Sequence, residues 1–191
     1  MITAGQSGVF IFKFNYSGKY SPEMAVKVDV LGIYISIELS QRIQTEHTLE
    51  SCKGLKIDKK AGLLMSWNRT SVSFNELIHD ARLLAQYENV YSSDEKTTDL
   101  LVYPKQRYFI AATNEGKIHI FKYKPLHKVE HHGRIVHTFT GHSKSVTSIC
   151  KFQGKGNLIL SVSLDGTARI WCTNTFQHHY TFQLTAALKF V

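Results

Sequence analysis

The sequence predicts an all-β protein built from repeated antiparallel units, and three observations carry this prediction. Short apolar segments with strand-like alternation recur along the chain and are separated by turn signals. Two turn dipeptides, Glu115-Gly116 and Asp165-Gly166, lie 50 residues apart in similar surroundings, which indicates an internal repeat. Of the 191 residues, 43% are hydrophobic and 12% aromatic, which is enough apolar material for a β-sheet core.

The segment 134–182 contains the most complete unit. It opens with Gly141-His142. A first strand pattern follows at 146–152 and a second at 158–163. Asp165-Gly166-Thr167 then makes a tight turn, and a third strand runs up to Trp171. The order of these features is more specific than any one of them.

This unit resembles a WD repeat, the four-stranded blade of β-propellers. Thirty positions separate Gly141 from Trp171, which suits that unit. The departure is Cys172, where the family pattern has aspartate after the tryptophan. The resemblance implies an all-β, partial WD-repeat β-propeller with about 3–4 blades of four-stranded antiparallel sheets.

The resemblance also implies a structural network of four side chains. The indole N–H of Trp171 would donate to Ser161, the Ser161 hydroxyl would pair with His142, and His142 would pair with Asp165. A hydroxyl and an imidazole both donate and accept, and the carboxylate accepts and fixes the tautomer. A connected buried network of this kind stiffens a blade.

Three residues of that network also look like a Ser-His-Asp triad. The structural role already explains their spacing, and the sequence has no sign of an oxyanion hole or a nucleophile elbow. We therefore expect no enzyme activity, no catalytic residue and no cofactor. The neighbouring histidines, 127, 131 and 132 and also 178 and 179, lack the converging spacing of a metal site.

Three further hairpins are expected as degenerate copies. In the segment 108–122, Ala111 and Phe121 stand where the most complete unit has serine and tryptophan. We therefore expect an apolar contact between Ala111 and Phe121 in place of the hydrogen-bonded network. The segments 62–75 and 2–13 give weaker hairpins, the latter turning around Ser7-Gly8 with a second strand one residue shorter. Outer strands are expected at 33–39, 83–87, 135–139 and 179–182.

These units predict one domain, 1–191, with approximate blade pieces 1–40, 41–87, 99–139 and 140–183. The polar segment 88–99 is expected to be a loop between blades. A WD unit occupies about 40–45 residues, so the chain holds about three and a half blades. Both ends look like cuts through a larger ring, which predicts a fragment whose ring is completed by more blades or another chain.

Composition favours an intracellular, cytoplasmic protein, with a ciliary or flagellar compartment as the alternative. No apolar run is long enough to cross a bilayer, and the N-terminus lacks a signal-peptide pattern. The three cysteines, Cys52, Cys150 and Cys172, do not form a disulfide framework. Cys150 and Cys172 lie on strand patterns and are expected to fill the core.

Lysine and arginine number 23 against 15 acidic residues, a net charge of +8. This surplus makes binding of nucleic acid (RNA) through a basic surface the alternative function. The leading function, implied by the resemblance, is a non-enzymatic protein–protein interaction scaffold that binds other proteins and no membrane. The candidate partner contacts lie in the loops at one face: Ser143, Lys144, Ser145, Leu164 and Asn114.

Overall fold

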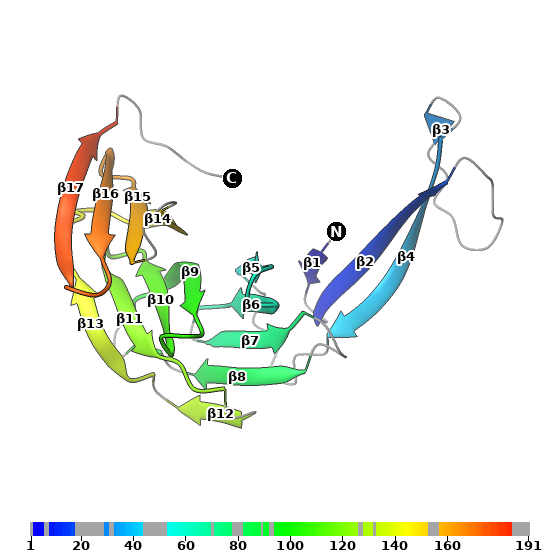
Figure 1. Cartoon of the computed structure of the whole chain (residues 1–191), viewed down its shortest axis with the longest axis horizontal. Coiled ribbons are helices and arrows are strands. Elements are labelled where there is room, and N and C mark those ends of the chain that lie inside the picture. Colours follow the sequence, from blue (N-terminus) through cyan, green and yellow to red (C-terminus); the bar gives the residue numbers. More distant parts are fainter. Residues whose placement is uncertain are drawn as a thin grey trace.

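A computed structural model describes residues 2–5, 8–17, 29–30, 33–43, 53–69, 71–77, 82–88, 90–91, 94–125, 128–131, 133–152 and 157–184. These residues form strands and turns, and the predicted all-β fold is confirmed. Four sheets follow one another in an open arc, and the described residues close no ring (Figure 1). The described part of the chain has no helix that is long and apolar enough to cross a membrane.

Sheet I is the N-terminal sheet, and all its strand pairs are antiparallel. Its strands, in spatial order, are β1 (Ile2–Gly5), β2 (Gly8–Ser17), β4 (Ile33–Ile43) and β3 (Asp29–Val30). Strand β2 has ten residues, so the expectation of a shortened second strand was wrong. The longer strand pairs along β4 as far as Ser17 and Tyr34.

Sheet II contains five strands, one more than a four-stranded blade. Four of them are consecutive in the chain and antiparallel: β5 (Gly54–Asp58), β6 (Leu63–Trp67), β7 (Val72–Glu76) and β8 (Leu83–Glu88). The fifth, β12 (Lys128–His131), pairs in parallel with β8. The expectation of purely four-stranded antiparallel sheets is corrected here, because a later segment uses the backbone groups at the edge of β8.

Sheets III and IV each contain four antiparallel strands. Sheet III consists of β9 (Thr97–Tyr103), β10 (Tyr108–Thr113), β11 (Ile118–Lys122) and β13 (Ile135–Phe139). Sheet IV consists of β14 (Val146–Lys151), β15 (Leu158–Ser163), β16 (Thr167–Cys172) and β17 (Gln177–Gln183). Because β9 begins at Thr97, the loop expected over 88–99 is shorter than predicted.

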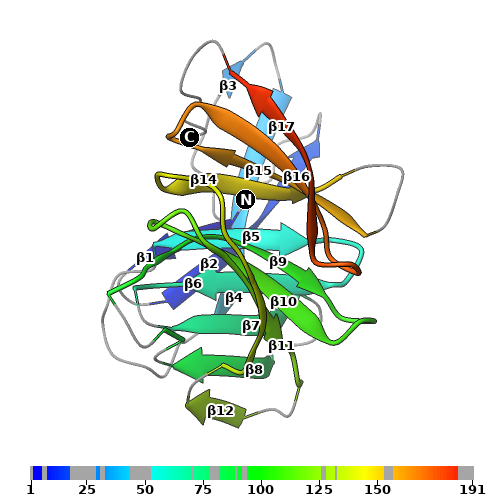
Figure 2. The same ribbon diagram turned by 90° about the vertical axis from the view of Figure 1, so that its left-hand side faces the viewer.

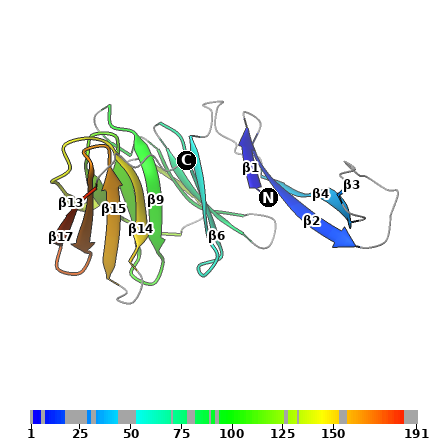
Figure 3. The same ribbon diagram turned by 90° about the horizontal axis from the view of Figure 1, so that it is seen from above.

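Apolar side chains fill the two spaces between sheets II, III and IV, which stand next to one another with sheet I beyond sheet II (Figure 3). Between II and III, the rings of Phe109 and Phe121 stack with centroids 4.9 Å apart, and Phe74 lies 5.1 Å from Phe109. Between III and IV, Ile120 and Phe139 pack with Trp171. Each such side chain contributes about 1.5–3 kcal/mol when fully buried.

A buried carboxylate joins the three strands β5, β9 and β14. Asp99 on β9 accepts hydrogen bonds from Lys56 Nζ at 2.9 Å, from the Ser148 hydroxyl at 3.0 Å and from the Ile149 N–H at 2.8 Å. Lys56 also donates to the Ile149 carbonyl oxygen at 2.9 Å. Asp99 therefore links strands of sheets II, III and IV to one another.

The strands of sheets II, III and IV have two common ends. One carries the β5–β6, β9–β10 and β16–β17 turns, at the right in Figure 2; we call it the β9–β10 end. The other carries the β10–β11 and β15–β16 turns and the segments 94–96 and 140–145 that lead into β9 and β14; we call it the β10–β11 end.

Candidate protein-interaction face

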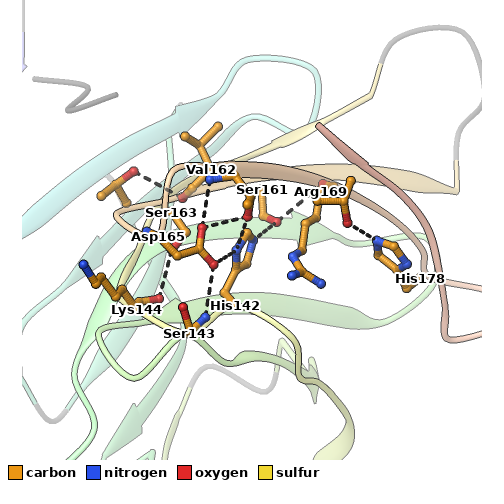
Figure 4. A network of polar contacts seen from close by, with 12 residues as sticks. His142, Ser143, Lys144, Ser161, Val162, Ser163, Asp165, Arg169 and His178 are labelled. Carbon is orange, nitrogen blue, oxygen red and sulfur yellow. Dashed lines mark hydrogen bonds and ion pairs between the residues drawn. The ribbon is translucent and has the colours of Figure 1, made fainter. Parts of the chain in front are cut away.

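The structure brings the four residues of the expected network together at the β10–β11 end of sheet IV. Figure 4 shows three of them, His142, Ser161 and Asp165. The Trp171 indole N–H donates to Ser161 Oγ at 2.8 Å. Ser161 Oγ lies 2.8 Å from His142 Nε2, and His142 Nδ1 lies 2.9 Å from Asp165 Oδ2. Ser161 is fully buried and His142 is 7% exposed, so a substrate has no access to this triad-like group.

The network assigns the proton positions. Asp165 accepts from His142 Nδ1–H, so Nε2 is the acceptor and the Ser161 hydroxyl donates to it. Burial lowers the pKa of His142, and this exceeds the opposing effect of Asp165. A neutral imidazole with its proton on Nδ1 therefore suits both Asp165 and Ser161.

The turn carboxylate has more partners than His142 alone. Although burial raises the pKa of Asp165, hydrogen bonds from Thr167 and His142 bring it well below its usual range. The Thr167 hydroxyl donates at 2.7 Å, and the Ser143 N–H donates at 3.0 Å. Asp165 thus ties the loop before β14 to the β15–β16 turn.

Glycine is required where the loop enters this network. Gly141 has φ of 151°, and a Cβ there would lie 2.7 Å from Arg169 Nη1 and 3.2 Å from the Trp171 ring. Gly116, with φ of 79°, would bring a Cβ within 2.6 Å of the His142 carbonyl oxygen. The turns of sheet III and the loop of sheet IV are therefore in close contact.

The five candidate contact residues lie on this same end. Asn114, Ser143 and Lys144 are exposed, whereas Ser145 and Leu164 are partly buried. Their backbone is held in place: the Leu164 N–H donates to the Ser145 carbonyl at 2.9 Å, and the Lys144 carbonyl accepts from Ser163 at 3.0 Å. The Asn114 side chain accepts from the Lys96 N–H at 2.7 Å. The result is a set of exposed side chains on a fixed backbone.

Sheet III has its own polar cluster, which the sequence did not indicate. Ala111 and Phe121 are fully buried as the expected apolar pair. Beside them, buried Glu95 lies 3.3 Å from His119 Nε2 and accepts from the Thr113 hydroxyl at 3.1 Å, and His119 Nδ1 lies 2.8 Å from Thr138 Oγ1. The expectation of an entirely dry substitute was wrong, because Glu95 comes from the loop before β9 and has no local sequence signal.

The expectation for Cys150 was also wrong. Cys172 is buried, but Cys150 is exposed. The register of β14 against β15 shifts between Val146 and Ser148, so Val146 and Ile149 share the buried face. This bulge turns Cys150 outward.

Comparison with known proteins agrees with this geometry. The family model "WD domain, G-beta repeat" matches residues 133–172, which include the β13 strand and all of the network. Residues 133–172 of this chain therefore match a WD repeat. A stretch of 39 residues of the chain is 56% identical to Pre-mRNA-processing factor 19 homolog 2 of Arabidopsis thaliana; it covers 20% of this chain and 7% of that protein.

Two solved structures resemble a larger part of the chain in fold. The structure of U3-55K matches 72% of it with a TM-score of 0.57 and 16% identity. The crystal structure of RRP9 WD40 repeats matches the same share with a TM-score of 0.57 and 15% identity. The chain spans 41% and 40% of the length of these two proteins. None of the three matched proteins supports the ciliary or flagellar alternative.

Proposed function

We propose that this WD40-repeat chain is a non-enzymatic scaffold that binds other proteins through its β10–β11 end. The observation that carries the proposal is the fixed surface formed there by Asn114, Ser143 and Lys144. Their side chains are exposed, and each has a hydrogen-bonded backbone. The Ser143 N–H donates to Asp165 of the network, the Lys144 carbonyl accepts from the Ser163 hydroxyl, and the Asn114 N–H donates to the Lys96 carbonyl. A preordered surface loses little conformational entropy when a partner docks.

The proposal includes the arrangement of the blades. The chain 1–191 acts as a partial propeller with blade pieces near 1–40, 41–87, 99–139 and 140–183, and further blades or another chain complete the ring. Support comes from the stacked apolar interfaces of sheets II, III and IV, which are the contacts expected between neighbouring blades.

The partners are proposed to be proteins of an intracellular RNA-processing assembly. This rests on the relative that is 56% identical over 39 residues and is named a pre-mRNA-processing factor. The likeness covers 39 residues, which are 20% of this chain, so it supports the class of partner and no individual contact.

The test compares two charge variants of the whole chain. In Ser143→Arg/Lys144→Glu the surface of the β10–β11 end changes while the backbone donors and acceptors remain. Lys105→Glu, at the β9–β10 end, is the control. Each tagged chain is used for affinity purification from nuclease-treated lysate at high salt, with quantitative mass spectrometry.

Proteins that are lost with the double variant and retained with Lys105→Glu support the proposal. Equal retention by all three chains, or equal loss from both variants, would overturn it. Circular dichroism spectra must agree among the chains, so that loss of binding is not loss of fold.

A further inference from the structure

The charged side chains of sheets II, III and IV are distributed unequally between the two ends. At the β10–β11 end the described residues carry five basic and five acidic side chains: Lys53, Arg69, Lys96, Lys117 and Lys144, with Glu88, Asp94, Glu95, Glu115 and Asp165. At the β9–β10 end they carry nine basic and two acidic side chains: Lys59, Lys60, Arg82, Lys105, Arg107, Lys122, Lys124, Arg134 and Lys151, with Asp58 and Glu76. All nine of these basic residues are exposed.

Direct contacts join the segments that carry these charges. Lys151, at the end of β14, places Nζ 2.6 Å from Asp58 and 4.8 Å from the centroid of the Tyr103 ring, next to the β5–β6 and β9–β10 turns. The Tyr108 hydroxyl donates to Thr173 Oγ1 at 3.1 Å, which links sheet III to the β16–β17 turn. These contacts bring together, at one end of the three sheets, the segments that carry Lys59, Lys60, Lys105, Arg107 and Lys151.

One of the two carboxylates on this surface is already neutralised. Burial raises the pKa of Asp58, but hydrogen bonds from Lys151 and Ala61 lower it below its usual value. Asp58 thus stays ionised and paired with Lys151, and Glu76 is the other carboxylate that the described residues carry at this end. Focused positive charge of this kind attracts polyanions.

Exposed aromatic rings accompany the charge. Phe152 follows β14 and is 41% exposed, and Phe176 lies in the β16–β17 turn and is 39% exposed. The Phe176 ring stacks on His137 with centroids 4.6 Å apart. An aromatic face beside cations is the arrangement on which unpaired bases stack.

The backbone at this end carries unusual conformations. In the described part of the chain, two residues other than glycine have positive φ, Arg107 at 57° and Phe176 at 56°. Both lie in turns of the β9–β10 end, one with a cation and the other with an exposed ring. Non-glycine residues in this region are strained and concentrate at functional sites.

We propose that the β9–β10 end binds single-stranded nucleic acid, with the lysine and arginine side chains on the phosphates and Phe152 and Phe176 on the bases. This goes beyond the protein-binding face, which lies at the opposite end. An acidic peptide would engage the charge but not require flat rings beside it, so the rings favour a nucleic acid.

The experiment measures fluorescence anisotropy of a labelled oligouridylate of about 16 nucleotides with the full chain at several salt concentrations. Lys59→Glu/Lys105→Glu changes turns of two sheets, and Lys53→Glu/Arg69→Glu makes the same change in net charge at the opposite end. We expect the first variant to weaken binding about tenfold or more. For this variant, the plot of log association constant against log salt concentration should become less steep by about 1.4, because each lost phosphate contact removes about 0.7 from the slope.

Equal weakening by both charge variants would overturn the proposal, since overall charge would then explain the binding. Absence of measurable binding by the wild-type chain at moderate salt would overturn it as well. Equal thermal melting curves for the three chains exclude unfolding as the cause.

The aromatic part has its own variant, Phe152→Ala, which removes an exposed ring. We expect binding to weaken about fivefold or more with an unchanged salt slope, because stacking is not electrostatic. Unchanged affinity, or competition by polyglutamate as effective as that by unlabelled oligouridylate, would contradict recognition of bases and make this end a site for acidic proteins.

Discussion

In sheet IV, Ile159 faces Trp171 across β15 and β16, whereas in sheet III the matching pair across β10 and β11 is Phe109 and Phe121. The register is the same and the chemistry differs. An indole buried in a sheet needs a hydrogen-bond acceptor, and Ser161 supplies it. A phenyl ring has no such requirement. Once phenylalanine occupies this position, the serine, histidine and aspartate that follow from tryptophan are no longer needed.

The two sheets nevertheless both bury a histidine next to a carboxylate. In sheet IV the histidine, His142, comes from the loop and the carboxylate, Asp165, from the turn between strands. In sheet III the carboxylate, Glu95, comes from the loop and the histidine, His119, from the strand. The comparison teaches that a loop must be fastened to its blade by a polar contact, while the residues that provide it are interchangeable.

The largest effect is expected for Trp171→Ala, which removes both a buried ring and the donor to Ser161. It should cost about 3–5 kcal/mol of unfolding free energy, measured by urea denaturation. Hydrogen exchange should accelerate over 146–172 and much less in sheet II, because the buried cluster around Trp171 is drawn from sheets III and IV among the described residues. Equal acceleration in all sheets would show that the blades do not respond separately.

A double-mutant cycle tests whether sheet IV tolerates an apolar ring with no hydrogen-bond acceptor, as sheet III does with Phe121. Ser161→Ala alone should cost about 1–3 kcal/mol, because the Trp171 N–H and His142 Nε2 lose their partner. Ser161→Ala/Trp171→Phe should cost less than the sum of the two single variants, since the indole N–H is removed together with its acceptor. Strict additivity in denaturant unfolding would contradict the hydrogen-bond argument.

Both sheets should lose stability on acidification, for the same physical reason. Burial lowers the pKa of His142 and of His119 below the usual value. The contribution of the two histidines to the unfolding free energy is complete above the pKa of an unfolded histidine, about 6.5, and is lost as the pH falls below it. Thermal melting between pH 8 and pH 5 checks this. His142→Gln and His119→Gln should each flatten the profile, and a flat wild-type profile would contradict it.

Sheet IV was predictable from the sequence because its key positions each require one particular residue type. Gly141 is needed for its φ and for space beside Trp171, and Trp171, Ser161, His142 and Asp165 require one another. Few other residues could replace them, so the pattern is visible in a single sequence. In sheet III the same places accept many residues, and only the spacing of Glu115-Gly116 and Phe121 indicated the strands.

Contacts made over long distances in the chain were not predictable. Glu95 is 24 residues from His119, and Asp99 is 50 residues from Ile149, so neither pair leaves a local pattern. Strand β12 joins the edge of β8 through a parallel pairing that depends on where the chain returns. The outward direction of Cys150 depends on a bulge in β14, which alternation alone does not indicate.

The smallest effect is expected at Glu115, which occupies in sheet III the turn position of Asp165 in sheet IV. Glu115 is paired with Lys117 at 2.9 Å, but both side chains are about two fifths exposed, at 41% and 39%. Glu115→Gln should therefore change the unfolding free energy by less than about 0.5 kcal/mol. Asp165→Asn should cost about 1–3 kcal/mol, because Asp165 is buried and accepts from His142, Thr167 and the Ser143 N–H. Similar costs for the two variants in urea unfolding would mean that the turn carboxylate has the same role in both sheets.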